Sequence, residues 1–348
     1  MPAISPAHIL ARAGTPALLI SNLTNIRYLT GLELSAGFLL ITQRKYRLFV
    51  DQRYREAAEG IALPAATIHD HEDLKNMLLR CRECGFEAND VTVDRLGRWK
   101  RIFKNTKFVR TKGVIEEFRR SKDARELRSF RRAQHITHEM LRRVPAVLRK
   151  GITERDVAWK LTSWAHELGA DGLAFDPIVA FGSHTSSPHH HPTGRKLRKG
   201  HIVQIDVGAR YRGYCADQSA VFFTRSPTAL QKRVLAAVEQ AKERATKACR
   251  AGVTNRELDR IACAVLKKHG FEDYIAHALG HGVGLEIHEG ISLSERAPKK
   301  KLLKNEIVTI EPGLYIPGKF GIRLEDEVVI RLRPAYAGLR TDSALRGV

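Results

Sequence analysis

The sequence predicts an α+β protein of two domains, a small α/β domain over residues 1–115 and a larger one over residues 116–348. Up to about residue 112, short strand-like runs alternate with helical stretches, which is typical of an α/β unit. Beyond that point, long amphipathic helices precede two predicted antiparallel hairpins. The chain of 348 residues is also long enough for about two domains.

The elements of the N-terminal domain follow from local pattern and from turn residues. Short apolar runs, rich in β-branched residues, predict strands over residues 17–20, 37–42, 46–51 and 91–93. Helical spacing predicts helices over residues 52–59 and 71–82.

The helices of the larger domain are indicated by their capping residues. Asp123 is a predicted N-cap for a helix over residues 124–149, and Thr153 is one for a helix that runs to Glu167. The later elements are predicted as a strand over residues 175–182 and two helices over residues 228–251 and 255–269.

The first predicted hairpin carries two aspartates. Residues 202–208 alternate in residue type and predict one strand, and residues 214–224 predict the returning strand. A turn centred just before Arg212 would place Asp206 directly opposite Asp217. Opposed residues have Cβ atoms about 4.5–5.5 Å apart. This spacing suits carboxylates that hold metal ions about 3.5–4 Å apart.

The second predicted hairpin carries two glutamates. Its strands are predicted over residues 306–311 and 322–331, and a turn centred on Gly318 places Glu311 opposite Glu325. A single hairpin of this kind is more often an ordinary surface hairpin with solvated acids. Two hairpins with matched acids favour a shared site instead.

A histidine embedded in glycines lies between the two hairpins in the sequence. His281 is part of the run G-H-G-V-G at 280–284. Four carboxylates and an imidazole that converge on one point would repel one another unless cations lay among them. The pattern therefore predicts a two-metal hydrolytic centre.

These motifs resemble those of the pita-bread metallopeptidases, specifically the Xaa-Pro dipeptidases (prolidases) and aminopeptidase P. The resemblance is carried by I-D-V-G at 205–208, G-Y-C-A-D at 213–217, G-H-G-V-G at 280–284, I-E-P-G at 310–313 and G-I-R-L-E-D at 321–326. Residues 25–31 and 48–54 are similar to the N-terminal domain of that family, and residues 113–122 resemble its linker into the catalytic domain. The resemblance implies a pita-bread catalytic domain preceded by a creatinase/prolidase-like α/β domain.

The resemblance also implies the residues of the site. The implied metal ligands are Asp206, Asp217, His281, Glu311 and Glu325. Glu311 is expected to act in addition as the proton shuttle. The implied substrate-binding histidines are His189, His277 and His288, of which His189 and His288 are expected to donate hydrogen bonds during catalysis. Arg323 is expected either to pair with Asp206 or to bind substrate.

The ligand set predicts the ions and the reaction. Oxygen-rich coordination with one imidazole favours two divalent ions, with Mn²⁺ preferred and Co²⁺, Fe²⁺ and Zn²⁺ as alternatives. A metal-bridging hydroxide is expected to attack the carbonyl of an Xaa-Pro bond in proline-containing peptides. The sequence does not separate a dipeptidase from an aminopeptidase.

Two segments depart from the family pattern. D-Q-S-A-V at 217–221 replaces the usual D-x-T-R-T, so that Ser219 keeps a hydroxyl while Ala220 replaces an arginine. The usual proline after Glu289 is missing. Neither change removes a ligand. Three further histidines, His184, His190 and His191, belong to the same loop as His189. We expect their side chains to be exposed and not to bind metal.

Three alternative functions remain open at this point. The net charge of +21 and the pI of about 10.0 suggest one of them, a metal-free pita-bread protein that binds nucleic acid or histones. Another is a metal-independent enzyme like creatinase, and a third is a methionine aminopeptidase. The complete ligand set argues against the first two, and the N-terminal domain argues against the third. We expect a cytoplasmic homodimer that does not bind membranes.

Overall fold

The computed structural model describes residues 4–60, 66–70, 72–333 and 344–345. The chain divides into two compact units, Met1–Arg119 and Arg120–Val348. Each unit mixes helices and strands, as the sequence predicts. Within the described residues, no helix combines the length and the apolar character needed to cross a membrane.

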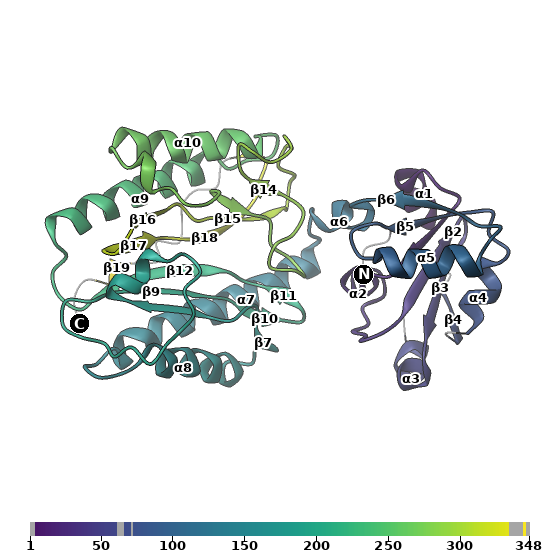
Figure 1. Cartoon of the computed structure of the whole chain (residues 1–348), viewed down its shortest axis with the longest axis horizontal. Helices are drawn as coiled ribbons and strands as arrows, with labels where there is room; N and C mark the ends of the chain where they lie inside the picture. Colours follow the sequence, from purple (N-terminus) through teal and green to yellow (C-terminus); the bar gives the residue numbers. More distant parts are fainter. Residues whose placement is uncertain (1–3, 61–65, 71, 334–343, 346–348) are drawn as a thin grey trace. The chain divides into compact units, whose positions relative to one another are not determined.

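The first unit is built on a six-stranded mixed sheet with the order β4-β3-β2-β1-β5-β6 (Figure 1). Its strands are β1 (Ala17–Ile20), β2 (Phe38–Thr42), β3 (Lys45–Val50), β4 (Ala66–Asp70), β5 (Glu83–Glu87) and β6 (Lys107–Thr111). Its helices are α1 (Pro6–Ala13), α2 (Leu23–Thr30), α3 (Arg55–Glu59), α4 (Asp73–Leu78), α5 (Val93–Ile102) and α6 (Val114–Arg119). The first three predicted strands are confirmed.

The prediction of a strand over residues 91–93 is wrong. Thr92 is the N-cap of α5, and its side chain accepts a hydrogen bond from the backbone N–H of Arg95. Capping therefore overrides the β-branched pattern. The predicted helix over residues 71–82 is shorter, at Asp73–Leu78, and His71 lies outside the described residues. The predicted linker contains α6.

The helices of the second unit are α7 (Ala124–Arg143), α8 (Glu154–Glu167), α9 (Ala229–Ala248) and α10 (Asn255–Lys268). The predicted N-caps are confirmed, because Asp123 and Thr153 each form a capping box at the start of their helix. α7 ends six residues before the predicted position, because the chain turns into a short 3₁₀ segment that contains Pro145.

The strands of the second unit form several small sheets. They are β7 (Gly172–Leu173), β8 (Ile178–Phe181), β9 (Ile202–Val207), β10 (Ala209–Tyr211), β11 (Tyr214–Cys215), β12 (Gln218–Phe223), β13 (Gly280–His281), β14 (Ser292–Leu293), β15 (Ile307–Ile310), β16 (Gly313–Ile316), β17 (Phe320–Arg323), β18 (Asp326–Val329) and β19 (Ala344–Leu345). The largest of these sheets has the order β19-β12-β9-β8.

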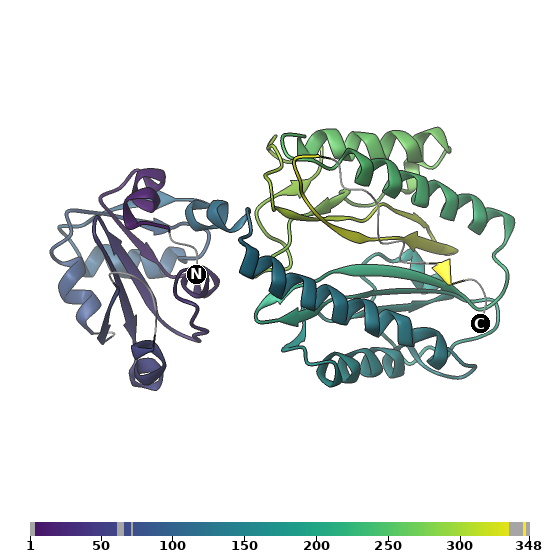
Figure 2. The ribbon, with the colours of Figure 1, turned by 180° about the vertical axis from the view of Figure 1, so that it is seen from behind.

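The second unit has two layers of helices with strands between them (Figures 1 and 2). α7 and α8 pack on β8, β9 and β12 through one apolar core, and α9 and α10 pack over β15 to β18 through another. Period-2 alternation divides β9 between its two faces. Val203, Ile205 and Val207 lie in the core of α7 and α8, so Asp206 faces the opposite side. The two cores thus enclose a polar layer.

The predicted register of the first carboxylate hairpin is wrong. Tyr211 pairs with Tyr214, and the two turn residues Arg212 and Gly213 both have positive φ, as a two-residue hairpin with right-handed strand twist requires. The turn is therefore centred one residue later than predicted. As a result, Asp206 pairs with Ser219 rather than with Asp217.

The predicted register of the second carboxylate hairpin is confirmed. The turn contains Gly318, which has a φ of 69°, and Ile316 pairs with Phe320. On the other side of the two glutamates, β15 pairs with β18 in the same register. The ladder is interrupted at Glu311 and Glu325, whose N–H groups bond to the carbonyls of Leu279 and Ser219 instead. These two bonds join the hairpin to neighbouring segments of the site.

Candidate metal centre

His281 approaches two of the carboxylates with its ring nitrogen Nε2. Its Nε2 is 3.5 Å from a carboxylate oxygen of Asp217 and 3.5 Å from one of Glu311. Its Nδ1 is 3.1 Å from the carbonyl oxygen of Gly282, a contact that holds the proton on Nδ1 and aims the lone pair of Nε2 into the site. Burial, together with nearby His288, lowers the pKa of His281 to about 4, so the ring is neutral at pH 7.

Glycine allows the strand of His281 to approach its neighbour. A Cβ atom at Gly280 would lie 2.2 Å from the carbonyl oxygen of Thr309, so no larger residue fits there without a shift of the backbone. The Thr309 hydroxyl accepts a hydrogen bond from the His281 N–H at 3.0 Å and donates one to Glu311 at 3.3 Å. Thr309 therefore fixes both groups.

The carboxylates are buried and crowded. Burial, with the charges of Glu325, Asp206 and Glu311, raises the pKa of Asp217 well above its usual value. Burial and the neighbouring acids raise the pKa of Glu325 in the same way. Burial raises the pKa of Glu311 to about 8, although Arg323 opposes this shift. Each shift means that the ionised carboxylate lacks compensating positive charge.

Two buried oxygens have the properties of metal-ligand positions. Asp206 Oδ1 and Glu325 Oε1 are among the buried side-chain atoms of the described residues that have no hydrogen-bond partner. The second oxygen of each carboxylate is occupied, by Arg323 in one case and by Ser219 in the other. Ligand atoms of Asp217, His281 and Glu325 also lie within 4.8 Å of one another. This donor set fits divalent cations.

A buried arginine connects these carboxylates. Arg323 Nη2 is 2.5 Å from Asp206 Oδ2, and Arg323 Nε donates to the Ser219 hydroxyl at 2.8 Å. That hydroxyl donates to Glu325 at 3.0 Å. Arg323 is only 3% exposed, so the geometry favours the ion pair over contact with substrate. Ser219 retains a structural role in the segment that departs from the family pattern.

We expect Arg323→Gln to destabilise the metal-free protein by about 3–5 kcal/mol, because the buried Asp206 would lose its partner. Denaturant unfolding of the EDTA-treated full chain measures this change. The matched control is Arg98→Gln, which breaks an exposed pair with Asp94 and should cost less than about 1 kcal/mol. Equal effects of the two substitutions would contradict the assigned role.

Sequence reasoning missed Tyr315. Its hydroxyl accepts a hydrogen bond from Arg323 at 2.8 Å and lies 2.8 Å from Nε2 of His277. Burial lowers the pKa of His277 to about 4, and its Nδ1 is 2.8 Å from the carbonyl of Ala278, so Nε2 accepts the proton of Tyr315. Tyr315 lies opposite Gly321, which is two residues from Arg323 and so on the same face of the hairpin. The alternation of strand residues could therefore have placed Tyr315 beside Arg323.

The two other predicted histidines lie at the edge of the site. His288 is exposed, and its ring centroid is 4.2 Å from that of His281. His189 is exposed too, and burial, together with nearby His189, lowers the pKa values of His277 and His288. Exposed imidazoles beside the candidate metal ligands can donate hydrogen bonds to a bound molecule.

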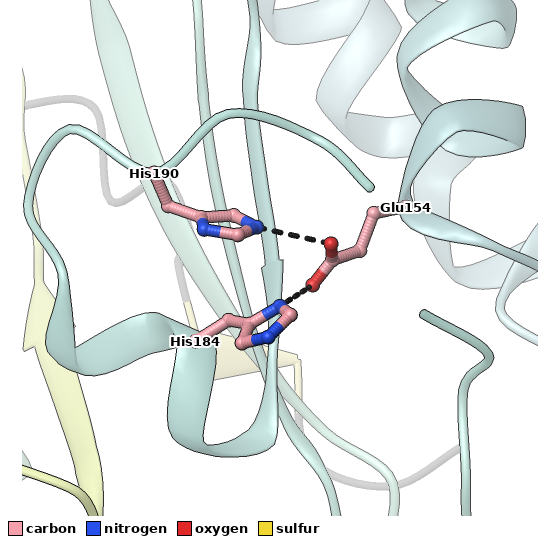
Figure 3. Close-up of side chains that lie close together, drawn as sticks. All are labelled: Glu154, His184 and His190. Carbon is pink, nitrogen blue, oxygen red and sulfur yellow. Dashed lines mark hydrogen bonds and ion pairs between the residues drawn. The ribbon is translucent and has the colours of Figure 1, made fainter. Parts of the chain in front are cut away.

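The expectation that His184 and His190 are simply exposed is wrong. Both are partly buried and point toward the carboxylate of Glu154, as Figure 3 shows. The buried Glu154 attracts them because its oxygens require donors. His191 is exposed, as predicted.

Comparisons with known proteins cover both units. Residues 128–331 match metallopeptidase family M24, and residues 7–121 match the creatinase/prolidase N-terminal domain. The chain is 30% identical to the Xaa-Pro dipeptidase of Pyrococcus furiosus over 94% of both chains. It resembles the structure of an Xaa-Pro dipeptidase from Bacillus anthracis with a TM-score of 0.89 and 28% identity, covering 93% of this chain and 94% of that one. The X-Pro aminopeptidase structure from Thermotoga maritima gives a TM-score of 0.85 and 31% identity over 94% of both chains.

Proposed function

The chain belongs to metallopeptidase family M24 and has its pita-bread fold, and from this membership we propose that it hydrolyses Xaa-Pro peptide bonds at a two-metal centre. The observation that carries the proposal is that Nε2 of His281 lies 3.5 Å from carboxylate oxygens of Asp217 and Glu311, while one oxygen each of the buried Asp206 and Glu325 is unpaired. Similar proteins with 30% or more identity include both an Xaa-Pro dipeptidase and an X-Pro aminopeptidase, so both remain within the proposal.

The proposed ligands are the five side chains Asp206, Asp217, His281, Glu311 and Glu325. Two divalent ions held there would lower the pKa of a water molecule and polarise the scissile carbonyl. Mn²⁺ is the proposed ion, because carboxylates outnumber imidazoles in this set. Arg323 pairs with Oδ2 of Asp206 and leaves Oδ1 unpaired, so that Oδ1 would be available to hold an ion.

Glu311 is the proposed proton shuttle. It would accept a proton from the attacking water and return it to the proline nitrogen as the peptide bond breaks. The hydroxyl of Thr309 donates to Glu311 Oε1, and this hydrogen bond limits the rotation of the carboxylate. The leaving nitrogen of an Xaa-Pro bond carries no hydrogen, so a positioned donor is required there.

We expect His288→Ala to lower kcat/KM about 100-fold while both metals stay bound, because His288 lies beside His281 without belonging to the ligand set. Peptide hydrolysis gives the rate, and elemental analysis of the dialysed protein gives the metal content. The matched control is His191→Ala, which removes an exposed histidine of the other loop. Loss of metal from the His288 variant would assign this histidine to coordination instead.

The proposed function is tested by comparing hydrolysis of Gly-Pro with that of Gly-Pro-Ala, each with Mn²⁺ and after treatment with EDTA. Mn²⁺-dependent cleavage of both peptides before proline indicates an aminopeptidase, and cleavage of Gly-Pro alone indicates a dipeptidase. Cleavage of Gly-Ala-Ala at the same rate as Gly-Pro-Ala would contradict the proposed specificity for proline. Full activity of a preparation shown to be metal-free would refute the metal mechanism.

Three further expectations from the sequence are retained as proposals. They are a homodimeric assembly, a cytoplasmic location and preference for Mn²⁺ over the other ions. A metal-free role in binding nucleic acid or histones is not favoured, because nothing in the ligand set has been replaced. The net charge of +21 is its only support.

A further inference from the structure

A second cluster of metal-binding side chains is made entirely of residues outside the five proposed ligands. Glu154, the first residue of α8, is fully buried and lies next to His184 and His190. Its Oε1 is 2.8 Å from Nδ1 of His184, and its Oε2 is 3.0 Å from Nε2 of His190 (Figure 3). The two rings come from one loop, and their centroids are 4.4 Å apart.

The carboxylate of Glu154 is held in place by further donors. The N–H of Phe181 bonds to Oε1 at 2.9 Å, and the N–H and hydroxyl of Thr193 bond to Oε2 at 2.9 and 2.6 Å. Burial opposes ionisation of Glu154, yet the hydrogen bonds from Thr193 and His190 keep its pKa below the usual value. The group is therefore a fixed anion, and such outer donors orient a ligand before metal binds.

The spacing of the three side chains suits a small cation. Their ligand atoms all lie within 4.8 Å of one another. Zinc–nitrogen and zinc–oxygen bonds of about 2.0–2.2 Å place neighbouring tetrahedral ligands about 3.3 Å apart. The observed separations of 2.8 and 3.0 Å need only a small increase. A neutral imidazole can hold its proton on the other ring nitrogen, so coordination could replace each hydrogen bond.

The exposure of the cluster provides a route for an ion. The His184 side chain is 33% exposed and that of His190 is 12% exposed, whereas that of Glu154 is 0% exposed. Two imidazoles and one carboxylate leave the fourth position of a tetrahedral ion open to water. Imidazole-rich ligation also separates this cluster chemically from the oxygen-rich centre, which favours Mn²⁺.

We propose that Glu154, His184 and His190 bind one divalent transition-metal ion, with Zn²⁺ preferred, and that this ion joins the start of α8 to the loop that carries His189. The site is separate from the peptidase centre in its residues and does not depend on the proposed function. Its effect is structural. Cross-linking two segments that are otherwise joined by hydrogen bonds raises the free energy of unfolding when the ion is bound.

The test measures zinc binding to the full chain after the peptidase centre has been disabled by Asp217→Asn and His281→Gln together. Equilibrium dialysis with Zn²⁺, followed by elemental analysis, should find one bound equivalent. Adding His184→Gln or His190→Gln should weaken this binding at least about tenfold. His191→Gln, which changes the adjacent exposed histidine, is the matched control and should leave the equivalent in place.

A second measurement applies if the double variant does not fold. The otherwise unchanged chain is saturated with Mn²⁺ and then titrated with Zn²⁺, and the extra equivalent should resist excess Mn²⁺ and disappear with His184→Gln. The proposal is overturned if no zinc binds beyond the peptidase centre, or if zinc binds equally to the His184 and His190 variants. It is also overturned if His191→Gln weakens binding as much as they do. No outcome depends on peptidase activity.

Discussion

Asp217→Asn is expected to abolish both metal uptake at the peptidase centre and hydrolysis of Xaa-Pro peptides. The substitution keeps the size of the side chain but removes a charge beside the free nitrogen of His281 and the acid Glu325. A neutral amide is a much weaker ligand for a hard divalent ion than a carboxylate. Because the proposed mechanism takes both its nucleophile and its carbonyl activation from the ions, losing them should reduce turnover to the background rate.

The measurement combines elemental analysis with Gly-Pro hydrolysis for each variant. Glu325→Gln should behave in the same way, since its unpaired Oε1 is a proposed ligand atom. Asp94→Asn is the control, because Asp94 lies exposed in the first unit, where it pairs with Arg98. A variant at Asp217 that kept two bound ions and its activity would show that this residue is not a ligand.

The metal-free protein is expected to lose stability as the pH rises from 6.5 to 8. Burial raises the pKa of Glu311 from 4.5 to about 8, so in this range the folded state binds more protons than the unfolded state. Stability therefore falls with pH, because a raised carboxyl pKa stabilises the fold only while the group is protonated. Over the whole range from pH 4.5 to 8 the shift of Glu311 corresponds to about 5 kcal/mol, of which about 2 kcal/mol falls between pH 6.5 and 8. Asp217 and Glu325 have pKa values shifted in the same direction.

Two buried histidines oppose this pH dependence below pH 6.5, so the fall in stability is expected mainly above that pH. Burial lowers the pKa values of His277 and His281 from 6.5 to about 4. Folding with neutral rings becomes more favourable as the pH rises from 4 to 6.5, so this contribution opposes that of the acids in the lower range. As the pH rises above 6.5, the imidazoles lose their remaining protons in the unfolded state as well, so their opposing contribution fades while the buried acids continue to lose protons.

Thermal unfolding of the EDTA-treated chain at a series of pH values measures this dependence, and saturation with Mn²⁺ supplies the comparison. Bound ions should raise Tm most at pH 8, because the ions stabilise the carboxylates that destabilise the metal-free fold. Glu311→Gln should flatten the decline between pH 6.5 and 8. A metal-free protein whose Tm rises across that range would contradict the assigned burial of these acids.

The second carboxylate hairpin could be predicted because its turn residue determines its register. Gly318 adopts positive φ at the centre of the turn, and the strands on either side then pair as expected. The first hairpin could not be predicted in the same way, since the alternatives for its turn differ by one residue. Arg212 takes a positive φ there, which few non-glycine residues do, and the pattern gave no sign of it.

The sequence by itself determined the types and order of the acids, the single histidine of the metal centre and the faces on which strand residues lie, because alternation is a local property of the backbone. Only the tertiary structure decided which oxygens remain free. Asp206 meets Arg323 and Glu325 meets Ser219 across more than 100 residues of chain. It also decided that Glu154 gathers His184 and His190. Such contacts depend on how buried polar groups are satisfied once the segments have packed, and no local pattern contains that information.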